Sequence, residues 1–351
     1  MSNAVAAKRQ TNMDLLRITA SFLVILLHVA SAFWGWGDMY RPGWMGIATY
    51  AVMTRCCVPL FLMISGKLFL ERNDAVPIRK LLLGYTLKLV VLYVAWGLLY
   101  AVDDLGLNVL FSENWLDVPW YFATSPHYHL WYLPMQTCIY LMLPIFWALA
   151  KHEKGKYLGY ACAMICAFRV VYETLELFVP MGDAVSSFMG RYDSFLSVYC
   201  AYFLLGYYVS TRKWEKLKVW HCLVGFLVSM GAAAAFTIVS SRMSGVYDDR
   251  LVENYQITTF IGTISLYLAY LKMPCNFSQR TGKVISMVSR CTLFIYLFHP
   301  FVLTRLDWFG INAVTFNPWI CVPVVTVGIF VICLIPALVL TKIPVVNKWL
   351  L

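Results

Sequence analysis

Long apolar runs recur along the whole chain and limit what it can fold into. A helix that crosses the hydrocarbon core of a bilayer needs about 20 predominantly apolar residues, and runs of this kind follow one another along the sequence. The chain is 61% hydrophobic and 13% charged, whereas soluble domains carry about 25% charged residues. A single soluble core cannot bury this much apolar surface, so the sequence predicts an integral membrane protein.

The runs are continuously apolar, which favours helices over a membrane barrel, because barrel strands alternate between apolar and polar residues. We therefore expect an all-α, polytopic transmembrane helix bundle of about ten helices. It forms a single integral membrane domain over residues 1–351, in which residues 1–12 are a short cytoplasmic N-terminal tail. The expected spans are 13–35, 44–70, 79–102, 128–150, 157–179, 192–210, 219–241, 255–272, 284–304 and 318–341.

Basic residues in the connections predict the orientation of the bundle. The ends and the connections on their side carry seventeen Lys and Arg residues, against five on the opposite side. Cytoplasmic loops carry the excess of positive charge in membrane proteins, so both termini are expected in the cytoplasm. The formal net charge of +10 then serves orientation and anionic lipid headgroups, and we expect membrane lipids but no nucleic acid as partners.

The eleven cysteines form neither a disulfide nor a metal pattern. Ten fall inside predicted spans and Cys275 falls in a predicted cytoplasmic connection, so a disulfide framework has no support. Cys162 and Cys166 share one helix face, but no His or carboxylate run beside them indicates zinc. We expect no metal site.

Charged and titratable side chains inside the spans are the most informative feature of this sequence. Each costs about 2.5–3.5 kcal/mol on insertion scales and therefore needs a partner or a purpose. The set is Arg17, His28, Arg55, Arg169, Glu173, Glu176 and His299, with His127, His129 and Asp193 at span mouths.

Arg17 and His28 are eleven residues apart in the first predicted span. Eleven residues make almost three helical turns, so both side chains project from one face, roughly 16 Å apart along the axis. Arg17 is expected near the cytoplasmic surface and His28 in the outer half of the membrane. This face offers an anion site and a deep titratable base, although the spacing alone also fits a snorkelling Arg17 and a packing histidine.

Other polar groups are expected in the outer half of the bundle. Span 44–70 runs inward, which brings Arg55 to roughly the depth of His28. His299 stands before Pro300, where a helix interruption would open backbone groups to a cavity.

Arg169 and Glu173 are four residues apart on one predicted helix. Side chains at this spacing are neighbours on the helix surface. The two opposite charges therefore either neutralise each other or take part in binding a polar acceptor.

Four segments, in order, resemble the acyltransferase-3 family. Asp14-Leu15-Leu16-Arg17 through His28 resembles the first helix of that family, with its arginine, ten intervening residues and histidine. The others are residues 59–66 (PLFLMISG), which resemble its second helix, 129–133 (HLWYL), its H-L-W-[FY]-L segment, and 293–300 (LFIYLFHP), its late [LI]-Y-L-x-H-P segment. The likeness covers essentially the whole chain.

The resemblance implies an acyl donor, usually acetyl-CoA, on the cytoplasmic side and an acceptor outside. It implies functional roles for the arginine and histidine of the first helix, and for basic residues after the second helix. We expect Arg17, Arg79 and Lys80 to bind the phosphates of acyl-CoA. His28 is the expected general base on the acceptor hydroxyl, and Arg55 is expected to stabilise the oxyanion of the tetrahedral intermediate. An acyl-histidine relay through His28 is an open variant.

The expected acceptor is an envelope glycan or its lipid-linked precursor, and the expected location is a bacterial-type plasma membrane that the chain crosses several times. Acceptor-binding candidates are Arg169, Glu173, His129 and His299. Two other classes of function fit parts of the sequence. A transporter or exporter of a small polar metabolite such as an amino acid would also need charges at the midplane. A receptor-like or scaffolding membrane protein would explain the topology but leave the Arg17 and His28 face without a purpose.

Overall fold

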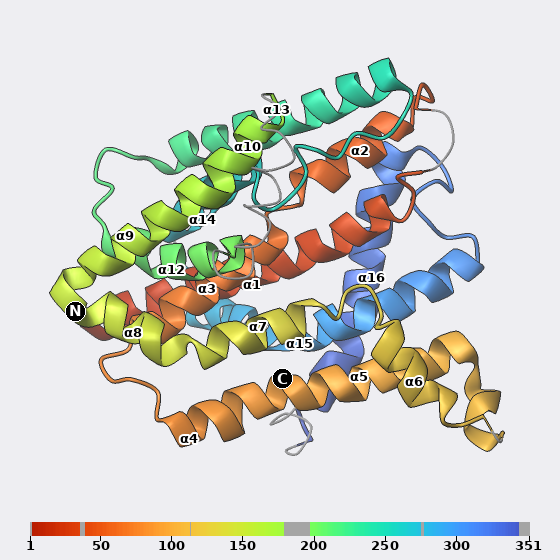
Figure 1. Cartoon of the computed structure of the whole chain (residues 1–351), viewed down its shortest axis with the longest axis horizontal. Helices are drawn as coiled ribbons and strands as arrows, with labels where there is room; N and C mark the ends of the chain where they lie inside the picture. The colour runs from red at the N-terminus through yellow and green to blue at the C-terminus, as the bar shows by residue number, and fades with distance from the viewer. Residues whose placement is uncertain (1, 36–38, 113, 179–196, 275–276, 344–351) are drawn as a thin grey trace.

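The computed structural model describes residues 2–35, 39–112, 114–178, 197–274 and 277–343, and these residues contain helices but no strand. Figure 1 shows a bundle in which most helices run along one common axis, with α16 crossing it. The elements are α1 (Ser2–Ser31), α2 (Trp44–Met53), α3 (Cys57–Leu70), α4 (Ile78–Lys80), η1 (Leu81–Thr86), α5 (Leu87–Leu105), η2 (Leu107–Phe111), α6 (Asp117–Thr124), α7 (Tyr132–Leu141), α8 (Leu143–Lys151), η3 (His152–Gly155), α9 (Lys156–Ile165), η4 (Cys166–Val171), α10 (Tyr172–Glu176), α12 (Val198–Thr211), α13 (Val219–Ser244), α14 (Ile257–Lys272), α15 (Gln279–Trp308) and α16 (Pro318–Leu340).

The predicted helical membrane architecture is confirmed, while the count of ten spans stays a prediction. Seven described helical runs are long and apolar enough to cross a membrane: Thr11–Ser31, Trp44–Leu70, Ile78–Leu105, Lys156–Glu176, Val219–Ser244, Gln279–Trp308 and Pro318–Leu340. The pair α7 and α8, bent by 54°, forms an eighth if it is one span. The predicted spans 192–210 and 255–272 overlap the shorter helices α12 and α14. Residues 192–196, with Asp193, lie outside the described residues. Most of the predicted tail belongs to α1, which begins at Ser2.

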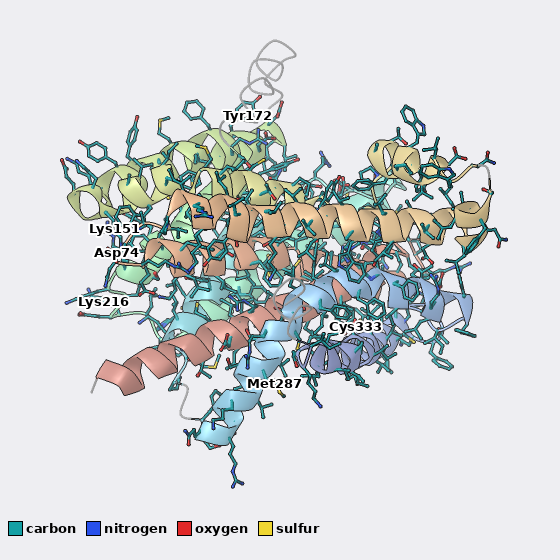
Figure 2. All side chains as sticks on the ribbon, turned by 90° about the horizontal axis from the view of Figure 1, so that it is seen from below. Asp74, Lys151, Tyr172, Lys216, Met287 and Cys333 are labelled. Carbon is teal, nitrogen blue, oxygen red and sulfur yellow. The ribbon has the colours of Figure 1, made fainter. Side chains whose placement is uncertain are left out.

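One end of the bundle gathers the connections that were predicted on the same side. Asp74, Lys151 and Lys216 come from three such connections, and Figure 2 shows all three at one end of the molecule. Figure 1 places the N-terminus at this end too. That this end faces the cytoplasm remains a prediction from the charge pattern.

The second membrane run is broken in its middle, between α2 and α3. Pro59 has no N–H to donate to the carbonyl of Arg55 four residues earlier, which weakens the helix at that point. Thr54 Oγ1 donates to the carbonyl of Tyr50 at 2.7 Å and closes the end of α2. The break places Arg55 in a turn rather than on a regular helix.

Helices α3 and α12 approach each other at glycines. A Cβ added to Gly66 would lie 1.7 Å from the carbonyl oxygen of Phe203, and one added to Gly206 would lie 1.9 Å from that of Met63. Small residues allow such close backbone approach in membrane bundles. This contact explains the glycine that ends the PLFLMISG segment.

Gly66→Ala is therefore expected to destabilise the protein by about 1–3 kcal/mol, because a methyl group forced into a packed contact must push the two backbones apart. The measurement is thermal unfolding of the purified protein in detergent. Gly231→Ala is the control, because nothing lies within 4 Å of its added Cβ and alanine favours a helix over glycine. Equal melting temperatures for Gly66→Ala and the unmodified protein would contradict this packing.

Candidate functional site

Helices α1 and α15 pack side by side and hold the candidate site between them. Near one end, Arg17 Nη1 donates to Ser289 Oγ at 3.4 Å and lies 3.9 Å from Asp14 Oδ1. Ser289 Oγ also donates to Asp14 Oδ1 at 2.8 Å. Three turns further along α1, His28 meets His299. The two contacts show that α1 and α15 run in the same direction, and that Arg17 and His28 both face α15.

The His28 and His299 rings are joined by a hydrogen bond whose direction follows from their surroundings. His28 Nδ1 lies 2.7 Å from His299 Nε2, with the two rings parallel within 1°. On its other side, His299 Nδ1 lies 2.7 Å from the carbonyl oxygen of Tyr296. A carbonyl only accepts, so the proton of a neutral His299 is on Nδ1, and its Nε2 accepts from His28 Nδ1. The remaining nitrogen of His28, Nε2, is therefore left with a free lone pair.

Pro300 leaves free the carbonyl of Tyr296, which orients His299. Helix α15 continues through Pro300, but proline cannot donate to the carbonyl of Tyr296 four residues earlier. His299 Nδ1 takes that vacant acceptor. The predicted interruption at Pro300 is thus a local loss of one backbone hydrogen bond, which fixes a side chain.

His129 and His127 lie beside the pair. The His129 ring is 5.8 Å from that of His299, and its Nδ1 lies 2.7 Å from His127 Nδ1. Tyr296 Oη donates to the carbonyl of His129 and ties the loop before α7 to α15. Burial lowers the pKa of His127, which lies in that loop. His129 and His299 are buried, whereas His28 is partly exposed, so His28 is the member of the pair that a substrate can reach.

A cavity of about 360 Å³ leads from Arg17 toward these histidines. Its walls are Arg17, Val58, Phe61, Ser65, Tyr85, Tyr132, Tyr140, Ser289, Arg290, Thr292, Leu293 and Tyr296. Seven residues of α15 separate Ser289 from Tyr296, which is roughly 10 Å of helix. The Tyr296 ring lies 6.0 Å from that of His299, so one layer of side chains separates the cavity from the histidine pair.

Arg55 lies in the turn between α2 and α3, with its guanidinium carbon 4.7 Å from the centre of the Trp34 ring. That Arg55 lies at roughly the depth of His28 stays a prediction.

Arg79 and Lys80 are exposed on α4, and neither is among the residues that line the cavity. Arg72 comes closer, since its Nη2 donates to the Oη of the cavity residue Tyr85 at 3.4 Å. The structure therefore does not bring Arg79 and Lys80 together with Arg17.

Arg169 and Glu173 form the ion pair that their spacing indicated, with 2.6 Å between Nη1 and Oε1. The Arg169 guanidinium also lies 5.4 Å from the centre of the Tyr255 ring. The α9–η4–α10 run that carries the pair packs mainly on α12 and α14 rather than on α15. This placement favours the structural interpretation of the pair over acceptor binding.

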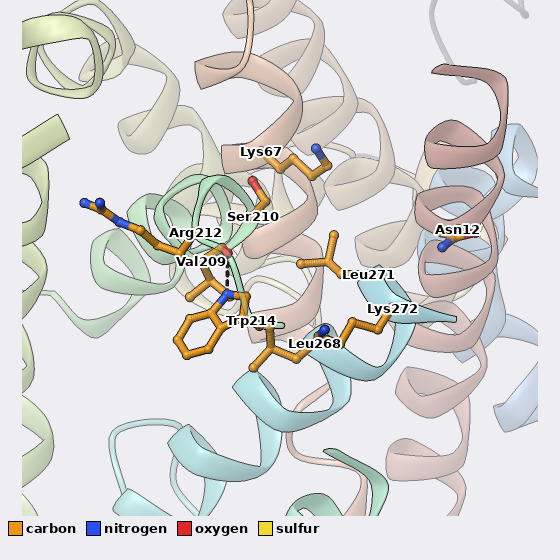
Figure 3. A pocket seen from close by; sticks show the side chains of 9 residues that line it. All are labelled: Asn12, Lys67, Val209, Ser210, Arg212, Trp214, Leu268, Leu271 and Lys272. Atoms are coloured by element: carbon orange, nitrogen blue, oxygen red, sulfur yellow. Dashed lines mark hydrogen bonds between the residues drawn. The ribbon is translucent and has the colours of Figure 1, made fainter. Parts of the chain in front are cut away.

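A second cavity, of about 180 Å³, borders α3, α12 and α14 and includes Asn12 of α1 (Figure 3). It contains three basic side chains, but Lys67 Nζ is already 2.6 Å from Glu71 Oε2. Figure 3 shows the guanidinium of Arg212 pointing away from Lys67. Asn12 and Arg17 are about 140° apart around α1, so this cavity does not lie on the Arg17 and His28 face.

Sequence reasoning missed several residues of the site. Tyr132, Tyr140 and Tyr296 line the cavity. Tyr132 and Tyr296 stand in the family-like segments 129–133 and 293–300, but no role was predicted for any of the three. Arg290 also lines the cavity, and no role was predicted for it. The described residues contain no group of three or more His, Cys, Asp or Glu side chains arranged to hold a metal ion.

Comparison with known proteins gives one match. The acyltransferase-3 family model, described as an acyltransferase domain, matches residues 10–338. No curated protein and no solved structure matches the chain.

Proposed function

Because the chain belongs to the acyltransferase-3 family of membrane acyltransferases, we propose that it is an O-acyltransferase of the cell envelope. It moves an acyl group, most simply acetyl, from cytoplasmic acyl-CoA to a hydroxyl of an extracytoplasmic glycan or its lipid-linked precursor. The observation that carries the proposal is the oriented His28–His299 pair, which one layer of side chains separates from the Arg17 cavity. The cavity suits a narrow thioester arm, and the pair supplies a base.

The chemistry requires a proton to leave the acceptor hydroxyl. His28 Nε2 takes that proton as the hydroxyl oxygen attacks the thioester carbonyl. Arg55 would stabilise the negative oxygen of the tetrahedral intermediate. The carbon–sulfur bond then breaks, and the thiolate of CoA takes the proton from His28. The products are an O-acyl glycan and free CoA.

The buried ring of His299 acts in this scheme by positioning His28. Its Nε2 accepts from His28 Nδ1 and so keeps the lone pair of His28 on Nε2. His129 packs against His299 from the side of the loop before α7. We propose that this loop, rather than the Arg169–Glu173 pair, lies next to the acceptor.

Donor binding is assigned to the basic end of the cavity. Arg17 and Arg290 line it, and the guanidinium of Arg17 is held there by Asp14 and Ser289. Arg79 and Lys80 are left as candidates for phosphates that project from the cavity mouth.

Arg17→Lys is expected to weaken acetyl-CoA binding about tenfold, because lysine keeps the charge but loses the bidentate fork that suits a phosphate. The measurement is titration of the purified protein with acetyl-CoA by calorimetry. Arg212→Lys is the control, since Arg212 lines the other cavity and points away from it. Equal affinity in Arg17→Lys, Arg17→Ala and the unmodified protein would remove Arg17 from the donor site.

The proposed reaction is tested by incubating purified protein with acetyl-labelled acetyl-CoA and envelope glycans. Label in an alkali-sensitive ester on the glycan would support it. Labelled acetyl-CoA that remains intact with every glycan offered would reject it.

A further inference from the structure

Three side chains that contact one another near the outer end of the bundle each carry a hydrogen-bond donor with no partner in the described part of the chain. The donors are Trp34 Nε1, Arg55 Nε and Tyr247 Oη, and each atom is buried. They come from three separate connections: the turn after α1, the break between α2 and α3, and the loop between α13 and α14. Native proteins pair nearly all buried polar atoms, so unpaired donors on three side chains in mutual contact are candidates for binding a ligand.

The three side chains form one stack. The guanidinium of Arg55 lies 4.7 Å from the centre of the Trp34 ring, and the Trp34 ring lies 4.7 Å from that of Tyr247, tilted by 30°. Trp44 supports the stack, since its ring meets Tyr247 edge-on at 6.4 Å and its Nε1 donates to the carbonyl of Trp34 at 3.3 Å. The stack is therefore held in place by contacts that leave its own donors free.

The chemistry of these atoms selects the ligand. Arg Nε and Trp Nε1 only donate, and burial raises the pKa of Tyr247, so its hydroxyl stays protonated and can donate too. Within the described residues no carboxylate pairs with Arg55, although an arginine inside a membrane protein needs a partner of opposite charge. A ligand that accepts from all three and carries negative charge is an oxyanion.

We propose that Trp34, Arg55 and Tyr247 form a subsite for an oxyanion, a carboxylate or a phosphate, carried by the glycan acceptor. The proposal rests on the function proposed above and names the acceptor class as an acidic glycan. The aromatic faces beside the donors suit the carbon face of a sugar ring. Because Arg55 is also proposed above to stabilise the oxyanion of the intermediate, the anionic group would lie beside the hydroxyl that is acylated. A guanidinium has five N–H donors, so an anion at Nε leaves donors for the reacting oxygen.

The test compares acceptors that differ only at one carbon. Oligosaccharides ending in glucuronic acid, glucose 6-phosphate or glucose are offered with acetyl-CoA, and kcat and KM are measured for each. The expected result is a KM at least about tenfold lower for the acidic acceptors than for glucose. The better of the two acids identifies carboxylate or phosphate as the natural group.

Conservative variants test whether the lower KM for acidic acceptors depends on the proposed subsite. Trp34→Phe and Tyr247→Phe each remove one donor and keep a ring, so each should raise KM for the acidic acceptor about tenfold and leave kcat and the neutral acceptor unchanged. Tyr50→Phe is the matched control, because the Tyr50 hydroxyl already donates to the carbonyl of Trp319. Equal KM values for acidic and neutral acceptors, unchanged by either variant, would mean that water fills the subsite and would overturn the proposal.

A binding measurement separates this proposal from the proposed reaction. Saturation-transfer NMR with methyl glucuronide and methyl glucoside needs no acetyl-CoA. Binding of the glucuronide alone, lost in Tyr247→Phe and kept in Tyr50→Phe, supports the subsite even if no transfer occurs. Equal signals from the two sugars reject the subsite even if transfer is observed.

Discussion

His28→Gln is expected to abolish acyl transfer while leaving the protein folded and able to bind acetyl-CoA. Glutamine keeps much of the size and hydrogen-bonding capacity of the ring but cannot take up a proton at neutral pH. General-base catalysis contributes about 10²–10⁴ in rate, and we expect a loss in this range because His28 is the member of the His28–His299 pair that a substrate can reach. The measurement is turnover per folded molecule, with acetyl-CoA affinity determined on the same preparation.

His28→Ala completes this comparison. A catalytic histidine predicts that alanine and glutamine are equally inactive and that both bind the donor normally, because the donor phosphates lie roughly 16 Å away along α1. A packing histidine predicts that glutamine is tolerated and that alanine lowers stability and activity in parallel. A fully active His28→Gln protein would remove the base from the mechanism.

His299→Ala is expected to lower kcat about 10²-fold, because His28 then loses the acceptor that keeps its lone pair on Nε2. The KM for acetyl-CoA should not change, since His299 does not line the donor cavity. His299→Gln should restore part of kcat, because its side-chain oxygen can accept from His28 Nδ1. The measurement is a steady-state rate over a range of acceptor and donor concentrations.

Pro300→Ala provides the companion test of this positioning role. Alanine restores a backbone N–H that competes with His299 Nδ1 for the carbonyl of Tyr296. We expect a smaller loss of kcat than in His299→Ala, and a changed pH–rate profile without any loss of thermal stability. A kcat for His299→Ala within twofold of the unmodified protein would show that the pair has no catalytic role.

Much of the fold could be predicted from the sequence because each membrane-spanning helix corresponds to a continuous run of apolar residues. The run 318–341 was predicted to within a residue of α16. The breaks were less visible, because a single proline decides whether a helix continues or bends. Pro300 stays inside α15, whereas Pro59 follows the break at Arg55.

The site was predictable only where it depends on spacing within one helix. The eleven-residue interval of Arg17 and His28 placed both on one face, and both now face α15. The pairing of His28 with His299 joins residues 271 positions apart, and no local pattern says which helices become neighbours. The same limit applies to Arg79 and Lys80. The sequence shows that they are charged, but it does not show whether they line the cavity.

The most direct test of the account places donor and acceptor on opposite sides of a membrane. Purified protein is reconstituted in vesicles with acetyl-labelled acetyl-CoA inside and glycan outside, and uniform orientation is verified by protease access to the N-terminus. The account predicts O-acetylated glycan outside and free CoA inside, with no product when the protein carries His28→Gln. Product that forms only when donor and acceptor share one side, or equal product with His28→Gln, would contradict a cavity that delivers the thioester from one face to a histidine base serving the other.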